Sequence, residues 1–280
     1  MAMLLEKIQG DDVIFQSKEY NTDSLLFNAI ESARFDSGFE LFSDHKSVIL
    51  MHMPGSPRVW IWTSSILKED TNRLIDICRF LRDRQIPKAE IYLKYDIAPA
   101  FSDLYAIASS DINYVIKDEL SLAVMTYERE SLPVSPQLPE EESIFLLDRD
   151  DAGQVEMVRS FYSSLKEEFH WQEKFERKLK EYLEADMYVL VRNGKIIGNI
   201  VIGNRTDAFA RVKSVAVRKE ERRKGYGYQL SSFIVRQVRS QSLSPILYTH
   251  VGNVSAMKLW AKTGFKEKNR LCLLKTETSD

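Results

Sequence analysis

The stretch 214–228 constrains this chain more than any other, because it changes within fifteen residues from a strand pattern to a helix pattern. A β-branched run ends at Val217, the charged turn 218–224 follows, and Gly225 and Gly227 then open an amphipathic helical run. The first turn of a helix has free N–H groups and the positive end of the helix dipole. Glycine lets the backbone approach a ligand closely. This order of elements therefore predicts a phosphate or pyrophosphate site.

A second stretch, 247–265, has the same strand-to-helix character. An apolar strand leads through Asn253 into a helix with Ala256 and Trp260 on its apolar face, and Gly264 ends it. A glycine motif alone is weak evidence, because a charged turn before a helix is commonly only a solvated surface. The second stretch, at this separation from the first, makes a ligand site the better interpretation.

Together the two stretches resemble the GNAT superfamily of acyl-CoA-dependent N-acyltransferases. Arg222-x-x-Gly225-x-Gly227 matches the acyl-CoA signature of that family, which also follows a strand. The run from Asn253 to Phe265 matches a second family element, except that Trp260 stands where Tyr is usual. The resemblance covers roughly residues 143–276.

The resemblance implies acetyl-CoA as the cofactor, lying between the strands 212–217 and 246–251. The pantetheine arm is expected to pair with the backbone of Val215 and Val217, and the Val217 amide to donate to the thioester carbonyl. The pyrophosphate is expected on the amides at the start of the next helix. The residues implied to bind the cofactor are Val215, Ala216, Val217, Arg222, Arg223, Lys224, Gly225, Tyr226, Gly227, Tyr228, Asn253, Ala256 and Trp260.

The implied reaction is direct acyl transfer to an amine, which is mostly protonated at neutral pH and must lose a proton. The strand position that carries Glu in many family members holds Arg211 here. The sequence leaves as candidate catalytic groups His250, Tyr248 and Glu168, of which His250 has an unperturbed pKa near working pH. Tyr226 is a further candidate acid. Further candidate bases lie in the acidic segment near Glu168: Glu167, His170 and Glu173. Each candidate also has an ordinary structural interpretation.

Trp260 leaves two interpretations open. An indole N–H donates a hydrogen bond but is not a usable acid, so Trp260 can steady a departing thiolate without protonating it. It can equally be a packing residue beside the cofactor.

At 280 residues the chain exceeds the commonest size of a single domain, which favours two domains. We predict a domain over 1–130, a Pro-rich linker over 131–142 and an acyl-CoA-binding domain over 143–280. The order of expected elements is the same in both halves. The predicted fold class is therefore α/β (α+β), with a mixed, mostly antiparallel twisted sheet flanked by helices, in two tandem GNAT-like domains.

The elements follow from apolar spacing, capping residues and turn signals. In the first half we expect a short helix at 24–30, a hairpin over 47–63, helices at 69–84 and 98–108, and strands at 88–93 and within 114–127. In the second half we expect helices at 151–166, 171–184, 226–240 and 254–262, with strands at 143–148, 186–192, 195–203, 208–217, 245–251 and 265–275.

The first half lacks the chemistry of the second. Between Trp62 and the helix near Glu69 the chain contains no glycine pair and no arginine at the motif spacing. We therefore interpret 1–130 as a degenerate, non-catalytic copy.

Composition narrows the remaining classes. Hydrophobic residues make up 44% and charged residues 29%, as in an ordinary globular protein, and the net charge of −2 favours neither nucleic acid nor a membrane surface as partner. Cys78 and Cys272 stand in apolar patterns without a nearby His, which favours buried free thiols over a disulfide or metal site. No stretch reads as a signal peptide or membrane span, so we expect a cytoplasmic protein, a monomer or a homodimer.

The favoured function is transfer of an acetyl group from acetyl-CoA to an amine of a small molecule or peptide. Transfer onto a protein N-terminus or an aminoacylated carrier is an alternative enzyme reading. A module that binds CoA without turnover is an alternative of another class. A dinucleotide-binding Rossmann domain is disfavoured, because no Gly-x-Gly-x-x-Gly follows an N-terminal strand.

Overall fold

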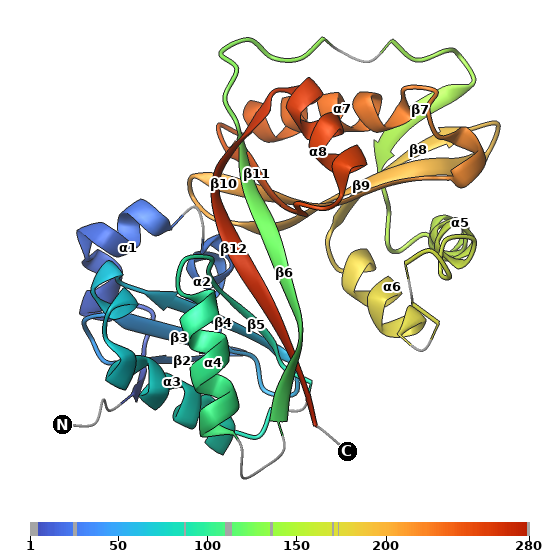
Figure 1. The fold of residues 1–280 in the computed structure, drawn as a ribbon. Helices are drawn as coiled ribbons and strands as arrows, with labels where there is room; N and C mark the ends of the chain where they lie inside the picture. The colour runs from blue at the N-terminus through green and yellow to red at the C-terminus, as the bar shows by residue number, and fades with distance from the viewer. Residues whose placement is uncertain are drawn as a thin grey trace. The chain divides into compact units, whose positions relative to one another are not determined.

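The computed structural model describes residues 5–24, 27–86, 88–109, 114–134, 137–169, 171–172 and 174–278. The chain forms two compact units (Figure 1). The first unit consists of Met1–Val124, Thr249–Gly252 and Glu267–Asp280, and the second of Met125–Tyr248 and Asn253–Lys266.

The first unit is a sheet with helices on both faces. Its strand order is β1-β2-β3-β4-β5-β12-β6. The strands are β1 (Glu6–Ile8), β2 (Glu40–Ser43), β3 (Val48–His52), β4 (Arg58–Thr63), β5 (Glu90–Lys94), β6 (Tyr114–Tyr127) and β12 (Phe265–Thr278). The helices are η1 (Val13–Gln16), α1 (Lys18–Asp23), α2 (Asn28–Ala33), η2 (Ser65–Lys68), α3 (Thr71–Asp83) and α4 (Ala98–Ala108). β4 pairs with β3 antiparallel and with β5 parallel.

Alternation along β4 divides the first unit's core between the two faces of its sheet. Ile61 belongs to the cluster that α3 and α4 cover, which also holds Cys78 and Cys272. Trp62 faces the other way and packs edge-on against Tyr20 of α1, with ring centroids 5.2–5.3 Å apart along the row Phe15, Tyr20 and Trp62. Both cysteines are free and buried, as predicted, and burial raises the pKa of each thiol to about 12.

The second unit has the strand order β11-β10-β9-β8-β7. Its strands are β7 (Glu142–Leu146), β8 (Asp186–Arg192), β9 (Lys195–Arg205), β10 (Phe209–Val217) and β11 (Ser244–His250), the last ending within the residues that group with the first unit. Its helices are α5 (Ala152–Ser163), α6 (Phe175–Leu183), η3 (Lys219–Glu221), α7 (Tyr226–Ser240) and α8 (Val254–Thr263). β10 is antiparallel to β9 and parallel to β11, the same pattern as β4 between β3 and β5.

Helices also cover both faces of the second unit's sheet (Figure 1). On one face, α5 and α6 pack through Phe161 and Leu179 on strand residues that include Ala216. On the other face α7 packs close to the sheet. This close packing requires glycine at position 198 of β9, because there is no room for a side chain there. A Cβ there would lie 3.0 Å from both the Ala216 carbonyl oxygen and the Leu230 Cδ1.

The structure confirms the predicted fold class and nearly all expected elements, with shifts of a few residues at their ends. The helix expected over 24–30 is wrong in its bounds, because α1 ends at Asp23 and α2 begins at Asn28; Leu25 and Leu26 lie outside the described residues. The segment 114–127 is one strand, as is the segment after Phe265.

The units do not follow the chain order of the predicted domains. Residues 267–280 group with the first unit, where β12 pairs with β5 from Leu271↔Lys94 to Lys275↔Glu90. The linker over 131–142 stays a prediction; Ser135 and Pro136 lie outside the described residues, and Glu142 already begins β7. Among the helices of the described ranges, none is long and apolar enough to cross a membrane.

Candidate functional site

The parallel pair β10–β11 opens partway along its length. Its register runs from Phe209↔Ser244 to Val212↔Leu247, whereas β10 continues to Val217. On its other side β10 stays paired with β9 up to Val217↔Gly198, after register shifts on either side of Val212. Such shifts bend a strand and increase its local twist. The last residues of β10 are therefore paired along one edge and have left the β11 ladder along the other.

The backbone groups of Val217 point to the open edge. The Arg218 N–H donates to the Ile197 carbonyl of β9 at 2.9 Å. Because backbone groups alternate in direction along a strand, the N–H and C=O of Val217 and of Val215 point away from β9. This orientation leaves the backbone groups of both residues facing the open edge; their pairing with a pantetheine arm, which the resemblance implies, stays a prediction.

No side chain of the described residues caps the start of α7. Gly225 is the N-cap residue, with φ of +93°, and no side chain accepts a hydrogen bond there. A Cβ at Gly225 would meet no atom within 4 Å, so the space beside it is open. The Gln229 N–H makes the helical bond to the Gly225 carbonyl at 3.1 Å, which leaves the preceding three amides as the free first-turn donors. A left-handed glycine followed by such donors is suited to an anion.

Arg222 joins the end of β10 to the segment after α5. Its Nε donates to the Val217 carbonyl oxygen at 3.0 Å, and its Nη2 donates to Glu168 Oε2 at 2.8 Å. The two side chains of this ion pair are 37% and 42% exposed. Glu168, a candidate base, is thus paired with the first residue of the glycine motif.

A network of ion pairs and hydrogen bonds stabilises the turn before α7. Lys224 donates to Glu221 at 2.9 Å, and Arg192 of β8 contacts both Glu221 and the Tyr226 hydroxyl, the latter at 2.9 Å. Tyr226 donates to Glu142 Oε1 at 2.7 Å. The Lys224 hydrogen bond, reinforced by Arg192, lowers the pKa of Glu221, and the bond to Glu142 raises the pKa of Tyr226. Tyr226 is 8% exposed with its hydroxyl committed here, so this geometry favours its structural interpretation over a role as acid.

The second motif forms α8. Asn253 is its N-cap, and the side-chain oxygen accepts from the Ala256 N–H at 3.1 Å. Trp260 is 4% exposed and packs edge-on against Phe265 with centroids 5.2 Å apart. The packing interpretation of Trp260 is therefore favoured. Tyr228 of α7 lies under the ammonium of Lys262, 4.8 Å from ring centroid to Nζ.

The candidate catalytic residues lie in different surroundings. Tyr248 of β11 is half-buried, with the Arg211 guanidinium 4.8 Å from its ring centroid. His250 ends β11, is exposed, and groups with the first unit. Glu167 is exposed beside Glu168. His170 and Glu173 lie outside the described residues, and the catalytic roles stay predictions.

A buried polar cluster lies against the opposite face of β10. The Asn199 Nδ2 donates to the Tyr162 hydroxyl at 2.7 Å, and the Ser214 side chain also bonds that hydroxyl. Burial strongly raises the pKa of Tyr162, so it stays protonated. Its ring packs among Trp171 and Tyr182, 5.2 and 5.4 Å away between centroids. The cluster therefore attaches α5 to β9 and to β10, the strand whose last residues are unpaired on the β11 side.

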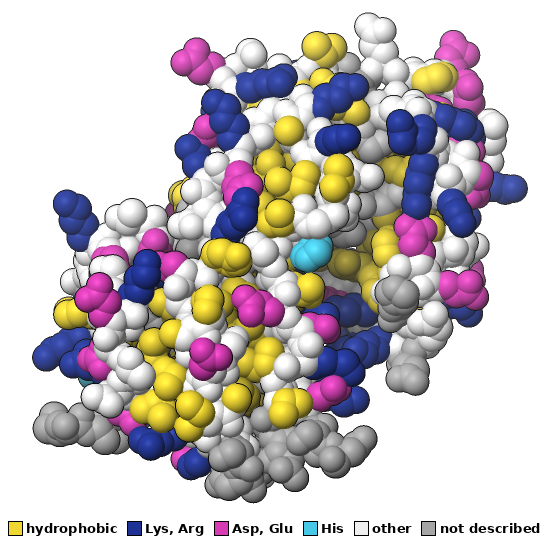
Figure 2. Space-filling model, in the orientation of Figure 1, with side chains coloured by type: hydrophobic (Ala, Val, Ile, Leu, Met, Phe, Trp, Pro, Cys, Tyr) yellow, Lys and Arg dark blue, Asp and Glu magenta, His cyan; other side chains and the backbone are white. Residues whose placement is uncertain are grey.

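Lys and Arg side chains are spread over the second unit around α7 and α8 (Figure 2). The turn 218–224 contributes five of them against Glu220 and Glu221. A local excess of positive charge attracts anions even when the whole chain is slightly negative. This surface therefore agrees with an anionic ligand at the start of α7.

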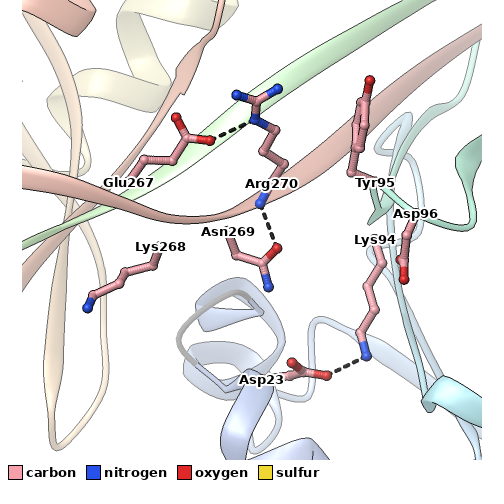
Figure 3. A pocket seen from close by; sticks show the side chains of 8 residues that line it. All are labelled: Asp23, Lys94, Tyr95, Asp96, Glu267, Lys268, Asn269 and Arg270. Atoms are coloured by element: carbon pink, nitrogen blue, oxygen red, sulfur yellow. Dashed lines mark hydrogen bonds and ion pairs between the residues drawn. The ribbon is translucent and has the colours of Figure 1, made fainter.

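The first unit holds a polar pocket of a different character, with a volume of about 550 Å³. Its side chains pair with one another: Lys94 Nζ lies 2.5 Å from Asp23, and Arg270 Nε donates to Glu267 at 2.7 Å (Figure 3). The lining residues are Asp23, Lys94, Tyr95, Asp96, Glu267, Lys268, Asn269 and Arg270. With three carboxylates among them, the pocket does not suit a diphosphate. Within the described ranges no group of His, Cys, Asp and Glu is arranged to hold a metal.

Comparison with known proteins agrees with this geometry. Residues 156–265 match the model of the Acetyltransferase (GNAT) family. The second unit carries a GNAT-family domain. The matched range contains both glycine-bearing motifs and the open edge of β10. No curated protein matches the chain significantly.

Solved structures extend the likeness to the whole chain as a fold. A Drosophila protein superposes with a TM-score of 0.66 at 14% identity, covering 98% of this chain and 99% of that one. A GCN5-related N-acetyltransferase from Sphaerobacter thermophilus gives 0.60 at 15%, covering 98% and 95%. A tandem GNAT protein from the clavulanic acid biosynthesis pathway gives 0.58 at 13%, covering 99% and 100%. The predicted GNAT-like fold of the N-terminal half is thereby confirmed.

Sequence reasoning missed the residues that support the GNAT motif. Glu142 was included in the predicted linker, Glu221 was part of the charged turn 218–224, and Arg192 was given no role. They come from two strands and a turn far apart in the chain, and only the pairing Glu142↔Arg192 brings them together. The acidic run Glu140–Glu142 at the start of a predicted strand was a signal that could have pointed to a partner for a basic side chain.

Proposed function

We propose that the second unit is an acetyl-CoA-dependent N-acetyltransferase whose acceptor is an amine of a small molecule or peptide. The observation that carries this proposal is the start of α7. A left-handed Gly225 facing open space precedes free first-turn amides, directly after a strand whose last residues are open along one edge. This combination suits a ligand that has an anionic diphosphate at one end and an extended amide-bearing arm at the other.

The residues present fit acetyl-CoA in two respects. The amides after Gly225 would hold the diphosphate, with Arg223 exposed beside them. The outward-pointing groups of Val215 and Val217 would pair with the pantetheine arm. Gly227 makes only an ordinary contact, since a Cβ there would lie 3.4 Å from Leu259 of α8. The family match over 156–265 supports the same assignment.

Acetyl-CoA supplies an activated thioester, so an amine forms the new C–N bond as the C–S bond breaks and CoA leaves as its thiol. In this chain the Val217 N–H is the donor oriented toward the open edge, where a developing negative charge on the carbonyl oxygen needs stabilisation. The acceptor must lose a proton, for which His250, Tyr248 and Glu168 remain the proposed candidates.

A second candidate function is CoA binding without turnover. Two observations favour it: Trp260 is buried where the family usually has Tyr, and Arg211 occupies a strand position that often holds Glu. Neither substitution removes the proposed binding surface for CoA. Both affect only the groups that would transfer protons during the reaction.

Two measurements separate these candidates. Acetyl-CoA should raise the thermal unfolding temperature in either case, because a ligand that binds only the folded state stabilises it. Release of free CoA thiol should then be followed with a panel of amines that includes amino acids, polyamines and peptide N-termini. Amine-dependent release supports the transferase. Stabilisation without release from any amine supports the binding module, and absence of stabilisation contradicts both.

A further inference from the structure

We propose that Glu168 competes with the diphosphate of acyl-CoA for Arg222, so that donor binding releases the Glu168 carboxylate from the motif turn. This inference rests on the proposed function. Its starting observation is that Arg222, the first residue of the glycine motif, already has two partners. They are the Val217 carbonyl oxygen at 3.0 Å and Glu168 at 2.8 Å.

Glu168 is held in place by its backbone. It lies in the turn segment 164–169, where the Phe169 N–H donates to the Leu165 carbonyl at 3.1 Å and the Trp171 N–H to the Lys166 carbonyl at 2.8 Å. Its carboxylate is therefore presented to the motif turn by an ordered segment. Its ion pair with Arg222 is roughly 40% exposed on both sides, so the pair is weak enough to be exchanged.

A diphosphate on the α7 amides would bring negative charge to the same guanidinium. Guanidinium binds phosphate oxygens in a fork of charge-assisted hydrogen bonds. A carboxylate on that guanidinium would then face like charge at close range, which is unfavourable. Lys224 is held differently, because its partner Glu221 is buried and is also paired with Arg192. Of these two ion pairs, the one between Arg222 and Glu168 is therefore the one that ligand binding changes more readily.

The consequence is a coupling between two parts of the second unit. With the donor site empty, Arg222 holds the Glu168 carboxylate, while Arg218 separately donates to Ser164 of the same segment at 3.1 Å. With acyl-CoA bound, Glu168 is freed. The carboxylate then becomes available only after the donor is in place.

The test is calorimetric titration of the full chain with acetyl-CoA and with acetyl-pantetheine, a thioester that lacks the diphosphate. Glu168→Gln removes the competitor, so acetyl-CoA should bind about two- to fivefold more tightly, as expected for an exposed ion pair. Acetyl-pantetheine affinity should not change. Glu167→Gln is the matched control, because it removes the same charge from the exposed neighbouring position.

A double-mutant cycle completes the design. In an Arg222→Gln background the effect of Glu168→Gln should disappear, because the two residues act through one contact. Unchanged or weaker acetyl-CoA binding by Glu168→Gln, or equal tightening by Glu167→Gln, overturns the inference while leaving the proposed function intact. If neither the wild-type chain nor Glu168→Gln binds acetyl-CoA, the proposed function itself fails.

Discussion

The two units share a strand–helix–strand arrangement but differ in the residues at the start of its helix. In each unit a strand is antiparallel to one neighbour and leads into a helix whose next strand returns parallel beside it: β4, α3 and β5 in the first, β10, α7 and β11 in the second. Both parallel pairs also end before the first strand does, at Trp60↔Tyr92 and at Val212↔Leu247. The backbone frame for an extended ligand is thus present twice.

The first unit fills this frame with its own acidic side chains. Asp70 caps α3 by accepting from the Arg73 N–H at 3.1 Å, where α7 has only Gly225. Glu19 of α1 accepts from the Ser65 N–H just after β4. Asp23 of the same helix accepts from the Trp62 indole at 2.9 Å. Carboxylates thus lie where an anionic ligand would have to bind.

The two units thus differ at the helix start and not in the fold around it. A carboxylate at a helix N-terminus satisfies the free amides and the dipole from within the protein, which stabilises the helix. A left-handed glycine leaves the same amides for a ligand at some cost in stability. The first unit therefore satisfies this helix start with its own side chain, and we propose that the second leaves it for a ligand.

The largest expected effect comes from giving α7 the cap of α3. Gly225→Asp places a carboxylate at the first-turn amides and a Cβ on a residue with φ of +93°. We expect acetyl-CoA affinity, measured by calorimetry, to fall by at least about 100-fold.

Gly225→Ala separates the two causes, because it introduces the same backbone strain without the charge. The open space beside Gly225 means that neither side chain meets a steric clash. Alanine should lose clearly less affinity than aspartate. Equal losses would show that backbone conformation alone decides binding, and no loss with aspartate would remove the diphosphate from this helix start.

The next effect concerns the network of Glu221, Lys224 and Arg192 at the motif turn. The pKa of Glu221 is lowered by Lys224 and Arg192, so its stabilising contribution is present above its ordinary value near 4.5. That contribution is lost as the pH falls through the lowered value. The unfolding temperature of Glu221→Gln should lie several degrees below wild type at pH 7, and the difference should shrink below about pH 4.5.

Glu220→Gln is the control for this measurement, because Glu220 is the exposed neighbour in the same turn. It should show little difference from wild type at either pH. A Glu221→Gln difference that is constant from pH 7 to pH 3.5 would contradict the role assigned to the ionised carboxylate.

A smaller effect is expected at the matching position of the first unit. Asp70→Ala removes the cap of α3 and should lower the free energy of unfolding by about 1 kcal/mol, measured by urea titration. Acetyl-CoA affinity should not change, because Glu19 and Asp23 still lie along the neighbouring strand. Tighter or additional acetyl-CoA binding would break the comparison, since it would show that the cap alone excludes the ligand.

The sequence predicted those parts of the site that are local in the chain. Gly225, the strand ending at Val217 and the Asn253 cap each express a backbone requirement that nearby residues reveal. The same holds for the tandem order of elements. Capping residues and hydrophobic periodicity indicate these features locally, independently of the tertiary structure.

The partners of the motif cations could not be predicted, because they depend on register and on segments far apart in sequence. Arg222 was expected to serve the phosphates, yet it contacts Glu168, 54 residues earlier in the chain. Lys224 likewise reaches Glu221, whose second partner is Arg192 on β8. Charged side chains look alike in sequence whether they are solvated or paired. Only the tertiary fold distinguishes the two cases.

The smallest expected effect tests whether both motif glycines serve the ligand in the same way. Gly227 lies inside α7 with an ordinary helical φ, and its added Cβ would lie 3.4 Å from Leu259 Cδ2, a normal packing distance. Gly227→Ala should therefore keep acetyl-CoA affinity within about twofold of wild type. Its unfolding temperature should be equal or higher, since alanine favours a helix over glycine. The same Gly→Ala change two residues earlier acts on a left-handed residue and should cost affinity. If the two substitutions weaken binding equally, glycine at 227 is required for close approach of the ligand, and the division between a backbone role at 225 and a packing role at 227 is wrong.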